Sequence, residues 1–122
     1  MPVYAFPKSS RLLRAEDFTA VLRGPDVNLS SGPLRIRARK NRMRSARLGL
    51  VVSKKGNPTA VRRNRIKRIV REQFRQYAHL LPAADIVIQV FGQLDDDQLE
   101  ELLKSRFSDI RQYFDHQVWQ GE

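Results

Sequence analysis

One stretch of this sequence, residues 60–75, constrains the fold more than any other, because it is strongly basic and still has the periodicity of a helix. It reads AVRRNRIKRIVREQFR and carries seven Lys and Arg side chains against one carboxylate, Glu72. At about 100° per residue, its apolar side chains fall on one stripe. The stripe consists of Ile66, Ile69, Val70, Phe74 and Tyr77. It predicts a helix from about residue 59 to residue 79 that packs on a core and ends before Pro82.

The polar side chains of this predicted helix divide into two groups. Those opposite the stripe are Asn64, Arg68, Arg71 and Arg75, flanked by Arg65 and Lys67. Arg62 and Arg63 fall on the apolar side, one turn before the first core residue, so we expect them to point across the rim of a sheet. The pattern predicts an outer basic face and an N-terminal corner, where free backbone N–H groups add positive charge. A turn or cap role for Asn64 is the alternative.

Apolar periodicity predicts the remaining elements. A short helix over residues 14–23 ends at Gly24-Pro25, and a last helix begins at residues 95–97. Strands are predicted over residues 27–29, 34–39, 48–53 and 86–91. Residues 34–39 alternate apolar with arginine, which indicates one face on a core and one on solvent or a ligand. Residues 48–53 are continuously apolar, which predicts a central buried strand.

The resulting order, α-β-β-β-α-β-α, predicts an α+β sandwich of helices on a mixed sheet of four strands. At 122 residues the chain has the size of one domain, so we expect a single domain over residues 1–122.

The net charge of +10 is unevenly distributed along the chain. Residues 1–81 hold 20 Lys and Arg against 4 acids, whereas residues 82–122 hold 3 against 9. Residues 35–75 alone hold 16 basic side chains and one acid. Such crowding is self-repelling unless a polyanion relieves it, and an ordinary solvated surface mixes both signs. The charge therefore favours a nucleic-acid partner, with an anionic membrane as the weaker alternative.

Several other classes of function are disfavoured by composition. There is no cysteine, hence no disulfide framework and no thiolate metal site. No apolar run approaches bilayer length and no signal peptide is evident, so we expect a cytoplasmic protein without a membrane partner.

The sequence offers no convincing catalytic group of its own. A nuclease site needs clustered carboxylates for metal ions, or a histidine with an acid or lysine partner. His79 and His116 are isolated, and capping together with the helix dipole explains the run Asp95-Asp96-Asp97 at a helix start. We therefore predict no catalytic residue and no metal ligand in the protein.

The order of the 48–53 strand, Lys54-Lys55-Gly56-Asn57 and Arg63-Asn64-Arg65-Ile66-Lys67-Arg68 closely resembles the bacterial ribonuclease P protein. The resemblance covers nearly the whole chain, including Phe6-Pro7, Arg11-Leu12, Asp17-Phe18 and the final strand and helix. It implies an α+β fold whose connection from the third strand through the basic helix to the fourth is left-handed, contrary to the usual rule.

The resemblance also implies a function. The family's protein is the subunit of ribonuclease P that binds the catalytic RNA and the single-stranded 5′ leader of precursor tRNA. It assists endonucleolytic removal of the leader, which gives the mature tRNA 5′ end, and it broadens the substrate range. The RNA performs the hydrolysis, with Mg²⁺ bound mainly by the RNA subunit and the substrate. One protein per RNA subunit is expected.

Two sets of residues follow from the resemblance. The catalytic-RNA-binding set is Arg62, Arg65, Lys67, Arg68, Arg71 and Arg75. The leader-binding cleft is Phe18, Leu22, Arg35, Ile36, Arg37, Lys54, Lys55, Arg63 and Asn64.

Leu22 stands where many relatives carry a second aromatic, and the strand around Ile36 lacks a tyrosine seen in some. These departures leave Phe18 as the one stacking aromatic, and we expect Arg35 and Arg37 to compensate through phosphate contacts or stacking. The spacing of Phe18 with Val21 and Leu22 fits a core position as well.

Three alternatives remain at this stage. A ribosomal or other structured-RNA-binding protein without a processing role has the same size, charge and fold class. A protein-only endoribonuclease would use Asp95 to Asp97, and a DNA-binding module would need a helix-turn-helix partner that the sequence does not offer.

Overall fold

The computed structural model describes residues 11, 12 and 14–120, with side chains up to Asp115. Phe6-Pro7 and the side chain of His116 lie outside the described residues. The elements are α1 (Ala15–Arg23), β1 (Val27–Ser31), β2 (Leu34–Lys40), β3 (Arg47–Val52), α2 (Ala60–Tyr77), a 3₁₀ turn (Ala78–Leu80), β4 (Ala84–Val90) and α3 (Asp96–Gln120). The predicted order of helices and strands is thereby confirmed, with boundaries that differ by one or two residues in most elements.

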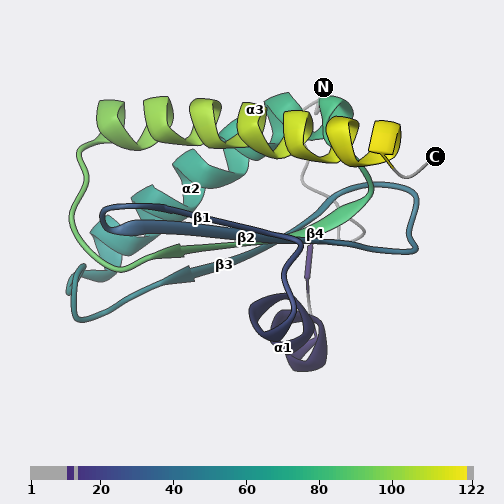
Figure 1. Cartoon of the computed structure of the whole chain (residues 1–122). Helices are drawn as coiled ribbons and strands as arrows, with labels where there is room; N and C mark the ends of the chain where they lie inside the picture. The colour runs from purple at the N-terminus through teal and green to yellow at the C-terminus, as the bar shows by residue number, and fades with distance from the viewer. Residues whose placement is uncertain (1–10, 13, 121–122) are drawn as a thin grey trace, which may run out of the picture.

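The four strands form one mixed sheet in the order β1-β2-β4-β3. β1 pairs with β2 and β2 with β4 in antiparallel fashion, while β3 and β4 are parallel neighbours joined through α2. Helices α2 and α3 lie over one face of the sheet and α1 lies under the other (Figure 1). The left-handed connection from β3 to β4 stays a prediction.

The prediction that β3 is a central strand was wrong. β4 is central and carries the most buried side chains. β3 pairs on one side with β4, and within the described part of the chain its other side meets a single bridge between Leu48 and Arg11. The Leu12 N–H donates to the Leu48 carbonyl at 2.9 Å, so the described start of the chain covers part of this edge. The core side of β3 packs against the main cluster and Gly49 on its other side lies under α1, whereas Val51 is exposed, so the continuous apolar run of β3 does not reflect strands on both sides.

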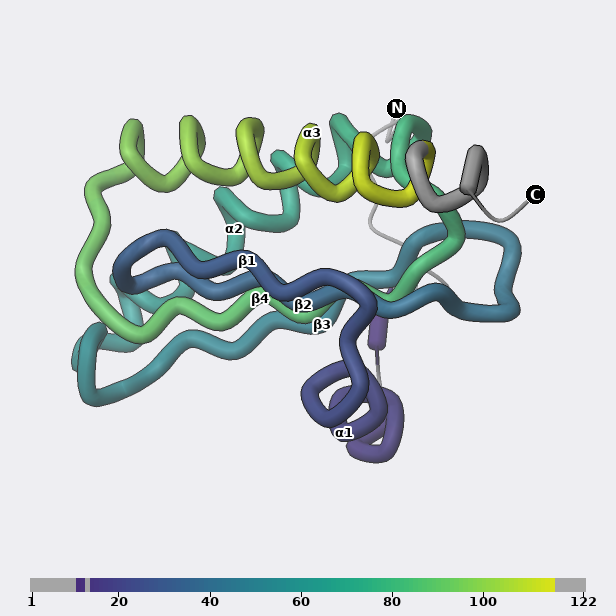
Figure 2. The backbone as a smooth tube through the Cα atoms, in the orientation of Figure 1, coloured from purple at the N-terminus to yellow at the C-terminus, as the bar shows by residue number. Residues whose placement is uncertain are grey.

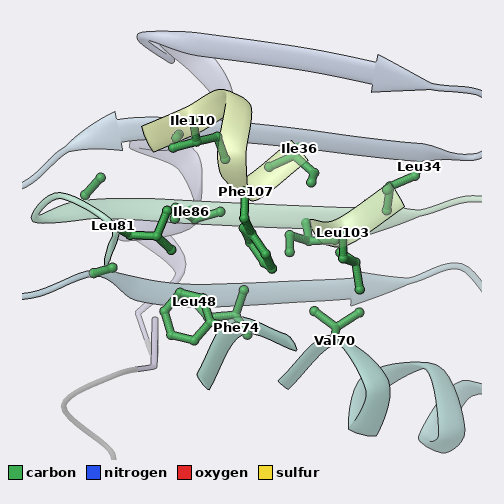
Figure 3. Packing of buried hydrophobic residues seen from close by; sticks show 14 of the residues in the cluster. Leu34, Ile36, Leu48, Val70, Phe74, Leu81, Ile86, Leu103, Phe107 and Ile110 are labelled. Atoms are coloured by element: carbon green, nitrogen blue, oxygen red, sulfur yellow. The ribbon is translucent and has the colours of Figure 1, made fainter. Parts of the chain in front are cut away.

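The main core lies between the sheet and the helices α2 and α3. Figure 3 shows Leu34, Ile36 and Ile86 of the sheet facing Phe107 and Ile110 of α3 and Phe74 of α2. The Phe74 and Phe107 rings meet edge to face, with centroids 6.2 Å apart. The predicted apolar stripe of α2 is confirmed, because Ile66, Ile69, Val70 and Phe74 are buried and Tyr77 packs against the same cluster.

A smaller apolar cluster fixes α1 to the opposite face. Leu12, Val21 and Val87 are buried there, and Phe18 and Leu22 are partly buried against them. The backbone tube in Figure 2 shows that α1 lies beneath one part of the sheet only. The rest of that face carries no helix among the described residues.

Candidate nucleic-acid interface

The sheet face that carries α1 is organised in three rows that run across β3, β4 and β2. Strand register gives the rows as Arg47, Asp85 and Arg39; Gly49, Val87 and Arg37; and Val51, Gln89 and Arg35. Alternate residues of a strand point to opposite faces, and the intervening side chains of these strands belong to the main core. The arginines of β2 therefore all belong to the α1 side, as their alternation with apolar residues predicted.

Helix α1 covers the first two rows. The Phe18 ring lies directly on Gly49, where an added Cβ would come within 2.7 Å of the ring. Arg39 Nη1 donates to the Ala20 carbonyl at 3.0 Å. The core interpretation of Phe18 is confirmed, because its ring packs against the small cluster. The ring is also partly exposed, and its role as a stacking aromatic stays a prediction.

The acids of the α1 side are held in the first row. Arg47 binds both carboxylate oxygens of Asp85 at 2.8 Å and approaches Asp17 at 3.8 Å. The hydrogen bond from Arg47 to Asp85 raises the pKa of the Arg47 guanidinium. Both carboxylates thereby face a cation in this row.

The third row is open. Val51 is 42% exposed and Phe91, just past the end of β4, is 45% exposed. Arg37 Nη1 donates to the Gln89 amide oxygen at 3.3 Å, and the Arg35 guanidinium lies over the Phe91 ring at 5.6 Å from its centroid. This part of the face is cationic and apolar at once.

A lysine-bearing loop borders the open row. The Asn57 side chain is buried and donates to the Gly92 carbonyl at 3.1 Å. Gly56 lies so close to Phe91 that a Cβ on it would be 1.9 Å from the Phe91 carbonyl oxygen. Because these contacts fix the loop against the end of β4, the exposed side chains of Lys54 and Lys55 stand at the margin of the open row.

The start of α2 forms the corner that the helix pattern predicted. The N-cap is Thr59, whose Oγ1 accepts from the Arg62 N–H at 3.2 Å, so the cap alternative for Asn64 was wrong. Arg63 Nη1 donates to the carbonyls of Asn57 and Pro58 at 3.0 and 2.8 Å, and Asn64 is exposed. Arg63 is therefore held toward the lysine-bearing loop.

The outer face of α2 presents Asn64, Arg65, Arg68 and Arg71 as exposed side chains. Lys67 and Arg75 are half-buried, and Arg75 lies 3.9 Å from Glu72. The predicted outer basic face is present, with Arg75 less exposed than its angular position indicated.

Arg62 lies on a third side of α2, toward the start of α3. Its guanidinium donates to Asp96 Oδ1 at 2.7 Å and to the Leu94 carbonyl, while Arg65 donates through Nε and Nη2 to Asp96 Oδ2 at 2.9 and 2.8 Å. The hydrogen bonds from Arg62 and then Arg65 hold the pKa of Asp96 below its ordinary value. Arg62 thus joins two helices instead of crossing the rim of the sheet as expected.

The assignment of Ile36 to the leader-binding cleft was also wrong. Ile36 is 1% exposed and belongs to the main core on the far side of the sheet. Its neighbours Arg35 and Arg37 occupy the cleft side, because consecutive strand residues alternate.

The acids at the start of α3 have structural roles. Asp95 Oδ1 accepts from the Gln98 N–H at 2.7 Å while Gln98 Oε1 accepts from the Asp95 N–H at 3.1 Å, a reciprocal cap. Asp96 is held by Arg62 and Arg65. Across the described residues, no group of three or more His, Cys, Asp or Glu side chains is placed to hold a metal ion.

Sequence reasoning missed four residues of these surfaces: Val51, Gln89, Phe91 and Asp96. A period of two through the last strand would have placed Gln89 and Phe91 on one face with Val87. Nothing in the sequence pairs Asp96 with Arg62, because that contact depends on how α3 packs against α2.

Comparison with known proteins identifies the family of this chain, whose two surfaces are an outer basic helix face and a partly covered cationic sheet face. A model of the Ribonuclease P family matches residues 6–113. The chain belongs to the ribonuclease P protein family.

Similar ribonuclease P proteins occur in several bacteria. The ribonuclease P protein component of Proteus mirabilis is 42% identical over 102 residues, covering 81% of this chain and 85% of the relative. That of Nitrosomonas eutropha is 46% identical over 89 residues, covering 72% and 74%.

Solved structures of ribonuclease P proteins share the fold. The Staphylococcus aureus protein superposes with a TM-score of 0.75 at 25% identity, covering 84% of this chain and 98% of that one. The Thermotoga maritima protein gives 0.61 at 34% identity, covering 78% and 96%. As a ribonuclease P protein subunit, the chain has a role in tRNA processing and an RNA subunit as partner. No helix in the described part is long and apolar enough to cross a membrane.

Proposed function

We propose that this ribonuclease P subunit holds two RNA strands on two surfaces that meet at the start of α2. The outer face of α2 binds the catalytic RNA, and the open row of the sheet, with α1 and the Lys54-Lys55 loop at its margins, binds the 5′ leader of precursor tRNA. One protein binds one RNA subunit. The observation that carries the proposal is the open, acid-free row beside Phe18.

The charges of the described residues support this division. The carboxylates of Asp17 and Asp85 both lie against Arg47, in the row farthest from the open row. The open row itself therefore offers Arg35 and the neighbouring Arg37 to an incoming strand, with Lys55 at its margin. Arg68 and Arg71 are exposed on the outer face of α2. Basic side chains that contact phosphates release condensed counterions, which favours RNA binding on both surfaces.

The chemistry is assigned to the RNA subunit. Mg²⁺ is held mainly by phosphates of the RNA and the substrate, and the protein neutralises phosphate where leader and catalytic RNA converge. The protein thereby favours precursor over mature tRNA, because only the precursor carries a leader for the open row. Its acids at the α3 start are already used, Asp95 as a helix cap and Asp96 against Arg62.

The test compares affinities of the reconstituted holoenzyme for precursor and mature tRNA at fixed salt. Arg37→Ala should lower the preference for precursor about tenfold, as expected when a charged contact to RNA is lost. Arg71→Ala is the matched control on the outer face; it should weaken assembly with the catalytic RNA and leave the preference unchanged. Equal affinity of the wild-type holoenzyme for the two tRNAs would contradict the proposal that the sheet face binds the leader.

A further inference from the structure

Phe91 is a large aromatic side chain that the fold does not use. It is 45% exposed at the end of β4, next to Val51, which is 42% exposed. It belongs to neither apolar cluster of the described residues. An exposed apolar pair ringed by polar groups is a common mark of a binding site.

The position of Phe91 is fixed by the backbone. Its N–H donates to the Pro33 carbonyl at 2.7 Å, which continues the pairing of β4 with the β1–β2 turn. Its carbonyl faces Gly56 closely enough to exclude any side chain there. With Val87 and Gln89 at the preceding alternate positions, Phe91 lies on the α1 side of the sheet. The ring is thus held on the open face by a rigid strand end.

Arg35 and Phe91 together form one surface, a guanidinium stacked on an aromatic ring. The guanidinium lies over the Phe91 ring, 5.6 Å from the centroid. A planar cation over an aromatic ring presents flat surface and positive charge together, which suits a nucleotide base and its phosphate.

The surroundings favour a nucleic-acid strand over an apolar peptide. Arg35 lies over the ring, Arg37 is on the same sheet face, and the loop of Lys54 and Lys55 is fixed beside Phe91 through Gly56. The carboxylates of Asp17 and Asp85 lie against Arg47, in the row farthest from the open row. A single strand with exposed bases and a phosphate backbone complements this combination.

Strand geometry also places Phe91 on the same track as Phe18. Phe18 lies on Gly49, which is paired with Val87, four residues before Phe91. At about 3.3 Å per residue, the backbone positions of Val87 and Phe91 are roughly 13 Å apart along the strand. On the neighbouring strand, Arg37 is level with Val87 and Arg35 with Gln89, and the Arg35 guanidinium reaches over the Phe91 ring. Each aromatic ring of the track therefore has an arginine beside it.

We propose that Phe91, with Arg35 stacked on it, is a second base-stacking platform that binds a leader nucleotide farther from the one at Phe18. This inference rests on the proposed function and adds a residue that determines how much of the leader is read. It also supplies the second aromatic that Leu22 does not provide on α1.

The test uses the reconstituted holoenzyme and precursor tRNAs with leaders of increasing length. Phe91→Leu should weaken binding about tenfold once the leader is long enough to reach the platform, and leave shorter leaders unaffected. Phe91→Tyr should restore binding, and Arg35→Lys should reproduce part of the loss because it keeps the charge and removes the plane. Tyr113→Leu, which removes an exposed aromatic from α3, is the matched control and should change nothing.

Abasic substitutions identify the nucleotide. At one leader position, removing the base should weaken binding to the wild-type holoenzyme but cause no further loss in Phe91→Leu. At the other positions, the losses from the abasic substitution and from Phe91→Leu should add. Unchanged binding of Phe91→Leu at every leader length overturns the inference. So does an equal loss for mature tRNA, which would indicate a folding defect.

The two proposals fail separately. If Arg37→Ala lowers the preference for precursor and Phe91→Leu does not, the platform is wrong and the leader-binding face stands. If neither variant changes the preference, the leader-binding face itself is wrong.

Discussion

At the scale of single residues, Gly49 sets how closely α1 approaches the sheet. A Cβ at this position would lie 2.7 Å from Phe18 Cε1 and 2.9 Å from Leu12 Cδ1. Both neighbours belong to the small cluster that fixes α1. The ring of Phe18 can therefore approach β3 this closely only over a glycine.

We expect Gly49→Ala to destabilise the protein by about 1–3 kcal/mol, the usual cost of overpacking. Urea unfolding measures this directly. Gly24→Ala is the control, since the nearest atom to its Cβ would be Arg39 Nη1, the end of a long side chain, at 3.3 Å. Equal stability of Gly49→Ala and wild type would contradict the packing described for Phe18.

Asp96 is the residue that most directly links the basic helix to α3. Its carboxylate accepts from both Arg62 and Arg65, which holds the pKa of Asp96 below its ordinary 3.8. A carboxyl group whose folded-state pKa is lowered stabilises the protein above its unfolded pKa. That contribution is lost as the pH falls through the lowered value.

Asp96→Asn should therefore reduce the urea midpoint at pH 7, and its difference from wild type should narrow as the pH drops below 3.8. Unfolding curves at a series of pH values test this. Asp97→Asn, at an exposed neighbouring position, is the control. A difference that stays constant down to low pH would show that Asp96 acts other than through its charge.

At the scale of elements, α2 serves the core and the outer basic face at once. Its buried stripe packs under α3, and Arg68 and Arg71 project from the opposite side. The stripe was predictable because helical periodicity is local. The exposure of Arg75 was not, because it depends on tertiary contacts that angular position alone does not include.

The affinity for the catalytic RNA falls as salt rises, and the slope of log affinity against log salt concentration reflects the number of phosphate contacts. We expect Arg68→Gln and Arg71→Gln each to reduce the magnitude of this slope by about 1, because each removes one phosphate contact. Filter binding across a salt series measures the slope. Gln76→Ala removes an exposed polar side chain of the same helix and should leave the slope unchanged. Slopes that match wild type in both arginine variants would remove the outer face of α2 from the RNA contact.

Other elements show where local pattern stops being informative. The alternation in β2 correctly separated a core face from an arginine face, yet Ile36 was assigned to the cleft although the same alternation places it in the core. The continuous apolar run of β3 predicted a central strand, but β3 is last in the strand order. An apolar run of this kind carries no information about strand order. Strand order, like the Arg62–Asp96 contact, is set by long-range packing.

At the scale of the whole molecule, the charge segregation seen in the sequence becomes a division in space. Arginines and lysines gather on the open sheet face, its bordering loop and α2, while α3 carries six of the thirteen acids of the chain. α3 and α1 lie on opposite sides of the sheet (Figure 1). The molecule therefore offers RNA a cationic surface that continues from the α1 side around the start of α2.

We propose that this protein helps an RNA catalyst without cutting RNA itself. The most direct test is cleavage of precursor tRNA by a transcribed ribonuclease P RNA at low Mg²⁺, with and without the purified, RNA-free protein. We expect little cleavage by either component alone and efficient cleavage when both are present. Cleavage by the protein alone, or no gain when the protein is added to the RNA, would contradict it.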